Sequence, residues 1–107
     1  MTTDTTRQPS QAMPVYLAPA PGAASKNITT ATTTEIKESA GYVTNIAINT
    51  GVAATTLKLY DGDPAGSGVL LGTWSTAAQN GIPVNIPFAT ALYAVTSGLA
   101  DVTVSYV

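Results

Sequence analysis

The amino-acid sequence predicts an all-β fold, a single antiparallel β-sandwich of about seven short strands. Three observations predict it. Short segments with alternating apolar and polar residues recur through most of the 107 residues. Turn sequences rich in glycine, asparagine and aspartate separate these segments. No amphipathic helix pattern lies between them, so there is no crossover helix for a parallel sheet, and a sandwich buries one face of each antiparallel sheet.

The chain divides near Asn27 into an extended arm, residues 1–27, and a β-sandwich domain, residues 28–107. Four prolines mark the arm: Pro9, Pro14, Pro19 and Pro21. Proline fixes φ and lacks a backbone donor, so this part of the chain is not expected to form a helix or a central strand. The arm is instead expected to be extended and similar to polyproline II.

Within the arm, Met13, Val15 and Leu17 alternate with Pro14 and Tyr16. An extended segment with apolar side chains on one side is suited to lie along another surface. The predicted partner-binding residues are therefore Met13, Val15, Tyr16 and Leu17. The alternative is a tail whose few apolar residues contact its own domain.

The first two expected strands are Thr29–Ile36 and Tyr42–Asn49. Thr29–Ile36 is rich in β-branched residues but polar. In the second strand, alternation predicts two faces. One face carries Tyr42, Thr44, Ile46 and Ile48, and the other Val43, Asn45, Ala47 and Asn49.

The third expected strand is Thr55–Tyr60, in which Leu57 and Leu59 point one way and Lys58 and Tyr60 the other. Asp61-Gly62 then turns the chain, which is typical of a hairpin. Four more strands are expected: Val69–Trp74, Ile82–Phe88, Leu92–Thr96 and Val102–Val107.

Ile82–Phe88 carries Pro83 and Pro87 on the face opposite its apolar side chains. Two prolines cannot both lie in a central ladder, so we expect an edge strand. Thr29–Ile36 is the second expected edge, and we expect it to pair within its own sheet or with another subunit. Such pairing favours a dimer or trimer.

Composition excludes several functions. Charged residues make up 9% of the chain, against roughly 25% in an ordinary soluble domain, and the net charge is −2. A chain with this negative net charge does not attract the negatively charged phosphates of nucleic acids, so no nucleic-acid partner is expected. No apolar run approaches the length of a membrane span. Histidine and cysteine are absent, so Ser and Thr have no base beside them, and neither enzyme activity nor a cofactor is expected.

Two weaker candidates for binding remain open. Asp61 and Asp63 flank a Gly-rich loop and could begin a calcium site, although turn formation explains the same residues. Tyr60 and Trp74 could form a sugar-stacking platform, or could contact other subunits or the core.

Five segments of this chain resemble small virion proteins of tailed bacteriophages. They are Tyr42–Thr50, Leu57–Gly62 with its Leu-Tyr-Asp-Gly turn, Gly68–Thr73, Leu92–Gly98 and Asp101–Tyr106. The resemblance spans roughly Ile28–Val107 and does not include the arm. It implies a β-sandwich or jelly-roll-like unit without catalytic activity that assembles in many copies.

The function expected from the resemblance and the residues together is that of a capsid decoration, or cement, protein. It would be located at the capsid surface of the virion, after assembly in the host cytoplasm, and would bind the major capsid protein or another virion protein as a homo-oligomer. One alternative is a tail, baseplate or head-fibre component. Another is a soluble carbohydrate- or calcium-binding module.

Overall fold

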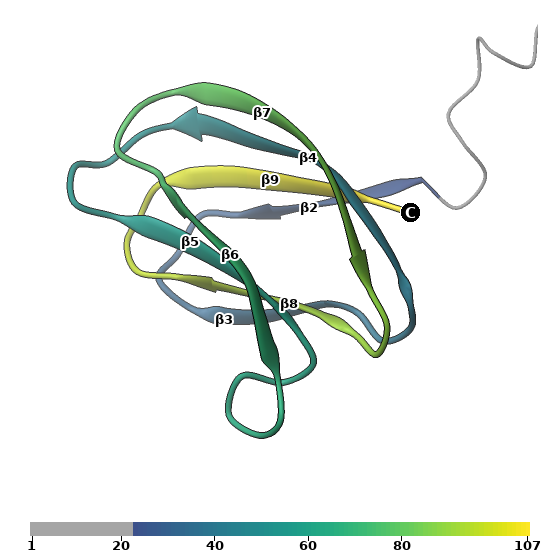
Figure 1. Ribbon diagram of the computed structural model, residues 1–107. Coiled ribbons are helices and arrows are strands. Elements are labelled where there is room, and N and C mark those ends of the chain that lie inside the picture. The colour runs from purple at the N-terminus through teal and green to yellow at the C-terminus, as the bar shows by residue number, and fades with distance from the viewer. Residues whose placement is uncertain (1–22) are drawn as a thin grey trace, which may run out of the picture.

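A computed structural model describes residues 23–107, which form two antiparallel four-stranded sheets and no helix (Figure 1). Within this range there is accordingly no helix that could cross a membrane. In chain order the strands are β2 (Ala24–Ile28), β3 (Thr33–Lys37), β4 (Gly41–Thr50), β5 (Thr56–Asp61), β6 (Val69–Ser75), β7 (Asn80–Phe88), β8 (Leu92–Thr96) and β9 (Asp101–Tyr106).

The strand pairing is nested. The first strand described, β2, pairs with the last, β9, and β3 pairs with β8, β4 with β7, and β5 with β6. The resulting sheet orders are β2-β9-β4-β7 and β3-β8-β5-β6. Short connections, residues 29–32 and 76–79, join β2 to β3 and β6 to β7. They place β2 and β3 along one side of the body, and β6 and β7 along the other (Figure 1).

One apolar core joins the two sheets in a sandwich-like arrangement. Its largest fully buried apolar side chains come from both layers: Val43, Ile46, Ile48, Val102 and Val104 from one, and Leu57, Leu59 and Leu92 from the other. These residues lie in cross-strand rows, such as Ile48 opposite Val102 and Leu57 opposite Trp74. Removal of this apolar surface from water is the main stabilising term of such a fold.

The predicted all-β, antiparallel class is confirmed, but the strand count differs. Residues 23–107 hold eight strands because residues 24–28, most of which were expected to belong to the arm, form β2, and the expected strand Thr29–Ile36 begins only at Thr33, after residues 29–32 cross between the sheets. Thr96 holds this crossing in place, since its hydroxyl bonds to the carbonyl oxygens of Thr30, at 2.5 Å, and Thr32, at 3.2 Å. β2 also includes residues 24–27, which sequence analysis assigned to the arm.

The predicted faces of Tyr42–Asn49 are partly wrong. Val43 is fully buried, whereas Tyr42 and Thr44 are exposed. The register of β4 against β9 shifts between Val43 and Asn45, so Thr44 is an extra residue in the ladder. A bulge adds one residue to the strand, so the side chains before and after it no longer alternate in step. Alternation counted across the bulge therefore assigns residues to the wrong face of the sheet.

Both predicted edges are confirmed: β7 ends one sheet, and β3, which overlaps the expected strand Thr29–Ile36 from Thr33 onward, ends the other and pairs in its own sheet with β8. As predicted, Ile82, Val84 and Ile86 face the core while Pro83 and Pro87 face solvent. β2 and β6 are the two remaining edges. The predicted arm residues Met13, Val15, Tyr16 and Leu17 lie outside the described residues.

Candidate interaction surface

A row of four residues crosses the outer side of the β3-β8-β5-β6 sheet. Glu35 is opposite Tyr93, Tyr93 is opposite Tyr60, and Tyr60 is opposite Leu70, so the row runs through all four strands. Both tyrosines are half-buried, and Leu70 is 50% exposed. We call this outer side, centred on the four residues, the tyrosine face.

Local sequence explains why these side chains point outward. Leu59 in β5 and Leu92 and Ala94 in β8 are fully buried, so their neighbours Tyr60 and Tyr93 face the opposite way. β6 contains a bulge, with Leu59 opposite Gly72 and Tyr60 opposite Leu70. The extra residue, Leu71, packs against the core, and Leu70 is placed on the outer face beside Tyr60.

The hydroxyl of Tyr93 anchors one end of the row. It donates a hydrogen bond of 3.0 Å to Oε2 of Glu35. This bond, together with partial desolvation and the negative charges of Glu35, Asp63 and Glu38, raises the pKa of Tyr93. Tyr93 therefore stays protonated at neutral pH and remains a donor, which fixes the orientation of its ring on the sheet.

A second row lies beside the first, two residues along β3, β8 and β5 and three along β6, where the bulge adds a residue. It consists of Thr33, Val95, Lys58 and Thr73. An aromatic and aliphatic centre is thus surrounded by hydroxyl groups, one ammonium and one carboxylate. Protein interfaces commonly combine such a centre, enriched in tyrosine, with a polar rim.

The outer side of the other sheet is different in chemistry. Asn27 and Asn49 each donate to Oδ1 of Asp101, at 2.6 and 3.2 Å, and to Oγ1 of Thr103, at 3.2 and 3.0 Å. These two amides lower the pKa of Asp101, because they stabilise its ionised form. The polar groups of this cluster bond to one another, and the one exposed aromatic residue of this side, Tyr42, has no aromatic neighbour in its register, so the tyrosine face is the better candidate for binding.

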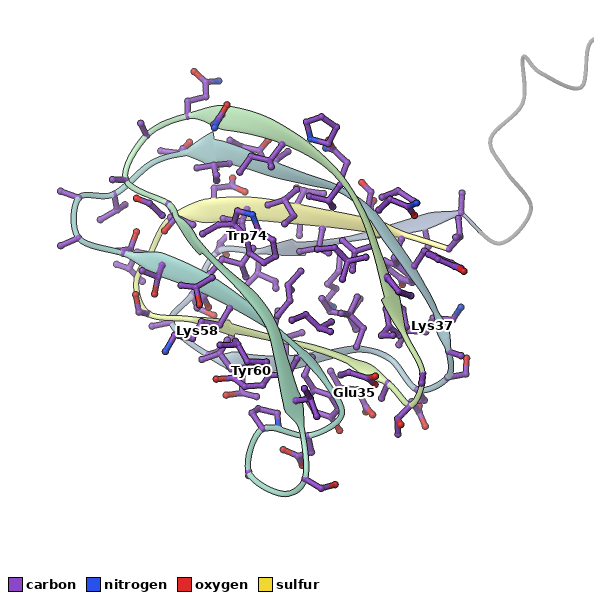
Figure 2. All side chains as sticks on the ribbon, in the orientation of Figure 1. Glu35, Lys37, Lys58, Tyr60 and Trp74 are labelled. Carbon is purple, nitrogen blue, oxygen red and sulfur yellow. The ribbon has the colours of Figure 1, made fainter. Side chains whose placement is uncertain are left out.

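Tyr60 and Trp74 lie on opposite faces of their sheet (Figure 2). Trp74 is opposite Leu57 and packs against the core from β6, between the two sheets. The sugar platform of these two residues therefore does not form, and Tyr93 is the aromatic neighbour of Tyr60 instead. Whether Tyr60 or Trp74 contacts another subunit stays a prediction.

Asp61 and Asp63 are engaged in turns. The carboxylate of Asp61 accepts bonds from the backbone N–H groups of Ala89 (2.9 Å), Thr90 (2.9 Å) and Ala91 (3.4 Å). The first two bonds, with a smaller contribution from Ala91, lower its pKa. Asp63 accepts one bond, of 2.9 Å, from the N–H of Ala65. The two carboxylates thus serve different turns, one between strands and one within the β5–β6 loop.

No pocket is found in the part of the chain that the structure describes. Residues 23–107 also contain no group of three acidic, histidine or cysteine side chains that could hold a metal ion. No protein-family model and no curated protein matches the chain. The outer surfaces of the two sheets are therefore the candidate sites for binding in the part of the chain that the structure describes.

Sequence reasoning identified Tyr60 but missed Glu35, Leu70 and Tyr93 as members of the same surface. A signal for Tyr93 was present, since alternation in Leu92–Thr96 sets it opposite the apolar Leu92 and Ala94. That β8 lies beside β5 could not be read from alternation, because strand order is a long-range property. The outward position of Leu70 depends on the bulge at Leu71.

Proposed function

We propose that this protein is a non-enzymatic structural component of a tailed-phage virion that decorates the assembled head. The observation that carries the proposal is the tyrosine face, which presents a pair of adjacent tyrosines and a half-exposed leucine on a rigid sheet. Clustered tyrosines supply contact area at low entropic cost and are enriched at protein interfaces. The face suits binding to a broad, flat protein surface such as a capsid lattice.

The nested strand pairing supports a jelly-roll interpretation of the fold. A jelly roll arises when a long hairpin wraps into two sheets, which pairs the first strand with the last and the two middle strands with each other. The four pairs β2–β9, β3–β8, β4–β7 and β5–β6 follow this order. Viral capsid domains use this architecture, but so do lectins and cupins, so the fold alone carries no function.

The test is binding of the purified protein to heads that lack it, measured by co-sedimentation. We expect the double variant Tyr60→Ser/Tyr93→Ser to stay folded and to lose at least tenfold in affinity, because two contact residues are removed. Tyr42→Ser is the matched control, since Tyr42 is 48% exposed but lies on the outer side of the other sheet. Equal binding by all three proteins would contradict the role of the tyrosine face.

A second candidate function is carbohydrate binding, which the pairing of Tyr60 with Tyr93 beside Glu35 and Lys58 favours. Flat aromatic rings stack on sugar rings, and neighbouring polar groups bond to sugar hydroxyls. Under this alternative the protein binds isolated glycans, and the same double variant abolishes that binding. Absence of glycan binding together with head binding would favour the decoration role.

A further inference from the structure

The four edge strands are not equally protected against pairing with another strand. β7 carries Pro83 and Pro87, and β3 is short, with Glu35 and Lys37 and a register shift against β8. β2 is also short and carries Lys26. Prolines, charges, bulges and short length are the usual means by which a sheet edge avoids further pairing.

β6 is the least protected edge. It is seven residues long, contains neither proline nor a charged residue, and exposes Val69 (64%) and Leu70 (50%). Its single bulge, at Leu71, faces β5. Among the described residues no strand pairs with the edge of β6 that faces away from β5. Its unpaired backbone groups therefore form a template for an added strand.

An apolar seam runs along this side of the body, between β6 and β7. Its members are half-buried and pack against the core: Leu71, Trp74, Ile82, Val84 and Ile86. In Figure 2, Trp74 lies between the two sheets on this side. A strand added to β6 with apolar side chains on its inner face would cover the seam and remove it from water.

We propose that residues Met13–Leu17 of a second copy of this chain add to β6 as a further, parallel strand. Met13, Val15 and Leu17 share one face of an extended strand, so all three cover the seam in a single register, while Tyr16 faces the outer side. The inward residues of β6 use their backbone groups on β5, as the N–H of Thr76 does on the carbonyl of Thr55. In a parallel strand the inward residues Met13, Val15 and Leu17 direct their backbone groups toward the free edge of β6, and Pro14, which lacks an N–H, faces away from it.

The position of β2 favours a second copy over the same chain. The arm precedes β2, which lies on the side of β3, whereas β6 lies on the side of β7. To add to its own β6, the chain would have to cross the whole sandwich within residues 18–23. That segment contains Pro19 and Pro21, which favour a stiff, extended connector. A stiff connector reaches a neighbouring copy more easily than it folds back.

We call this addition of the arm of one copy to β6 of another arm exchange. Its role in the virion rests on the proposed function, but the self-association itself does not. It links copies side by side on a lattice and covers the unprotected edge of each. Because its test uses purified protein without capsids, self-association and head binding fail or succeed independently.

The test is sedimentation velocity of the full chain and of two variants over a range of concentrations. The arm variant carries Val15→Asp and Leu17→Asp, and the edge variant carries Val69→Lys and Leu70→Lys. We expect the unmodified chain to associate with rising concentration, and each variant alone to stay monomeric. The control, Leu99→Lys, places the same charge at a residue that is 70% exposed in the β8–β9 loop, and should associate normally.

Mixing the two variants tests arm exchange even if one of them is partly misfolded. An equimolar mixture of the arm variant and the edge variant should form a one-to-one pair, because the intact arm of the edge variant can add to the intact β6 of the arm variant. A labelled peptide of residues 10–22 should bind the arm variant and not the edge variant. Association of the arm variant alone, a monomeric unmodified chain, or no complex in the mixture would each overturn arm exchange.

Discussion

At the scale of single residues, Asp61 does more for this fold than its place in a turn suggests. It ends β5, and its carboxylate bonds to three successive backbone N–H groups in the connection between β7 and β8. β7 and β8 belong to different sheets. One side chain therefore fixes the position at which the chain passes from one layer to the other.

Replacing Asp61 by alanine should lower the free energy of unfolding by about 1–2 kcal/mol, because three donors lose a charged acceptor that is partly exposed to water. Asp63→Ala is the matched control and should cost about 0.5 kcal/mol, since Asp63 holds one bond within its own loop. Urea unfolding curves of both variants measure the difference. Equal losses would mean that Asp61 does not link the two layers.

Stability should fall in acid. The pKa values of Asp61 and Asp101 in the folded protein lie below their ordinary value of 3.8. Folded protein therefore releases these protons more readily than the unfolded chain, and their contribution is fully present above the unfolded value. It is lost as the pH falls through the folded-state values. Melting curves between pH 6 and about pH 2 should show this, and Asp61→Asn should flatten the slope.

Ala54 is the one described residue other than glycine with a positive φ, at 61°. A left-handed conformation costs an alanine roughly 1–2 kcal/mol, whereas glycine adopts it freely but gains entropy in the unfolded chain. We expect Ala54→Gly to raise the free energy of unfolding by about 0.5 kcal/mol. Ala53→Gly, in the same loop, should lower it instead.

At the scale of the elements, the start of β2 decides where the arm can be cut. β2 pairs with β9 from Ala24 onward, so removal of residues 1–22 leaves every described strand intact. Removal of residues 1–26 deletes three of the five residues of β2 and leaves the edge of β9 that pairs with them without a partner strand.

We expect the shorter deletion to melt within about 2 °C of the full chain, and the longer one about 5–10 °C lower, which corresponds to a loss of about 1–2 kcal/mol. Calorimetry of both proteins tests this. A stable protein after the longer deletion would show that β2 contributes little to the fold.

Alternation in the sequence predicts the strands that contain no irregularity. Leu92–Thr96 has the expected bounds, and the inward faces of β5 and β7 are as predicted. Three predictions are wrong: residues 24–27 were assigned to the arm but belong to β2, a bulge at Thr44 changes which side chains face the core, and the polar residues 29–32 pass between the sheets instead of forming a strand. These features depend on long-range hydrogen bonds, such as those between Thr32 and Thr96, which no local pattern contains.

At the scale of the whole molecule, the two outer faces have unlike chemistry. One carries a hydrogen-bonded cluster of asparagine, threonine and aspartate together with the single exposed Tyr42, and the other presents two adjacent tyrosines beside a leucine. With four basic and six acidic residues in the whole chain, neither face carries a strong field. Binding that depends on apolar and aromatic contact should therefore change little with salt.

The weak salt dependence can be tested on the proposed complex with the head. Raising the salt concentration from about 0.05 to 0.5 M should change the affinity for heads less than threefold, because few charges are screened at the interface. Co-sedimentation at each salt concentration measures this. A loss of a hundredfold or more would point to an ionic contact and away from the tyrosine face.

Whether this protein decorates the head can be measured as its copy number in purified virions, determined by quantitative mass spectrometry against the major capsid protein. We predict a fixed ratio to the capsid subunit that survives repeated gradient purification, with density on the outer head surface by electron microscopy. Particles that are complete and stable without the protein bound anywhere on them would contradict the account.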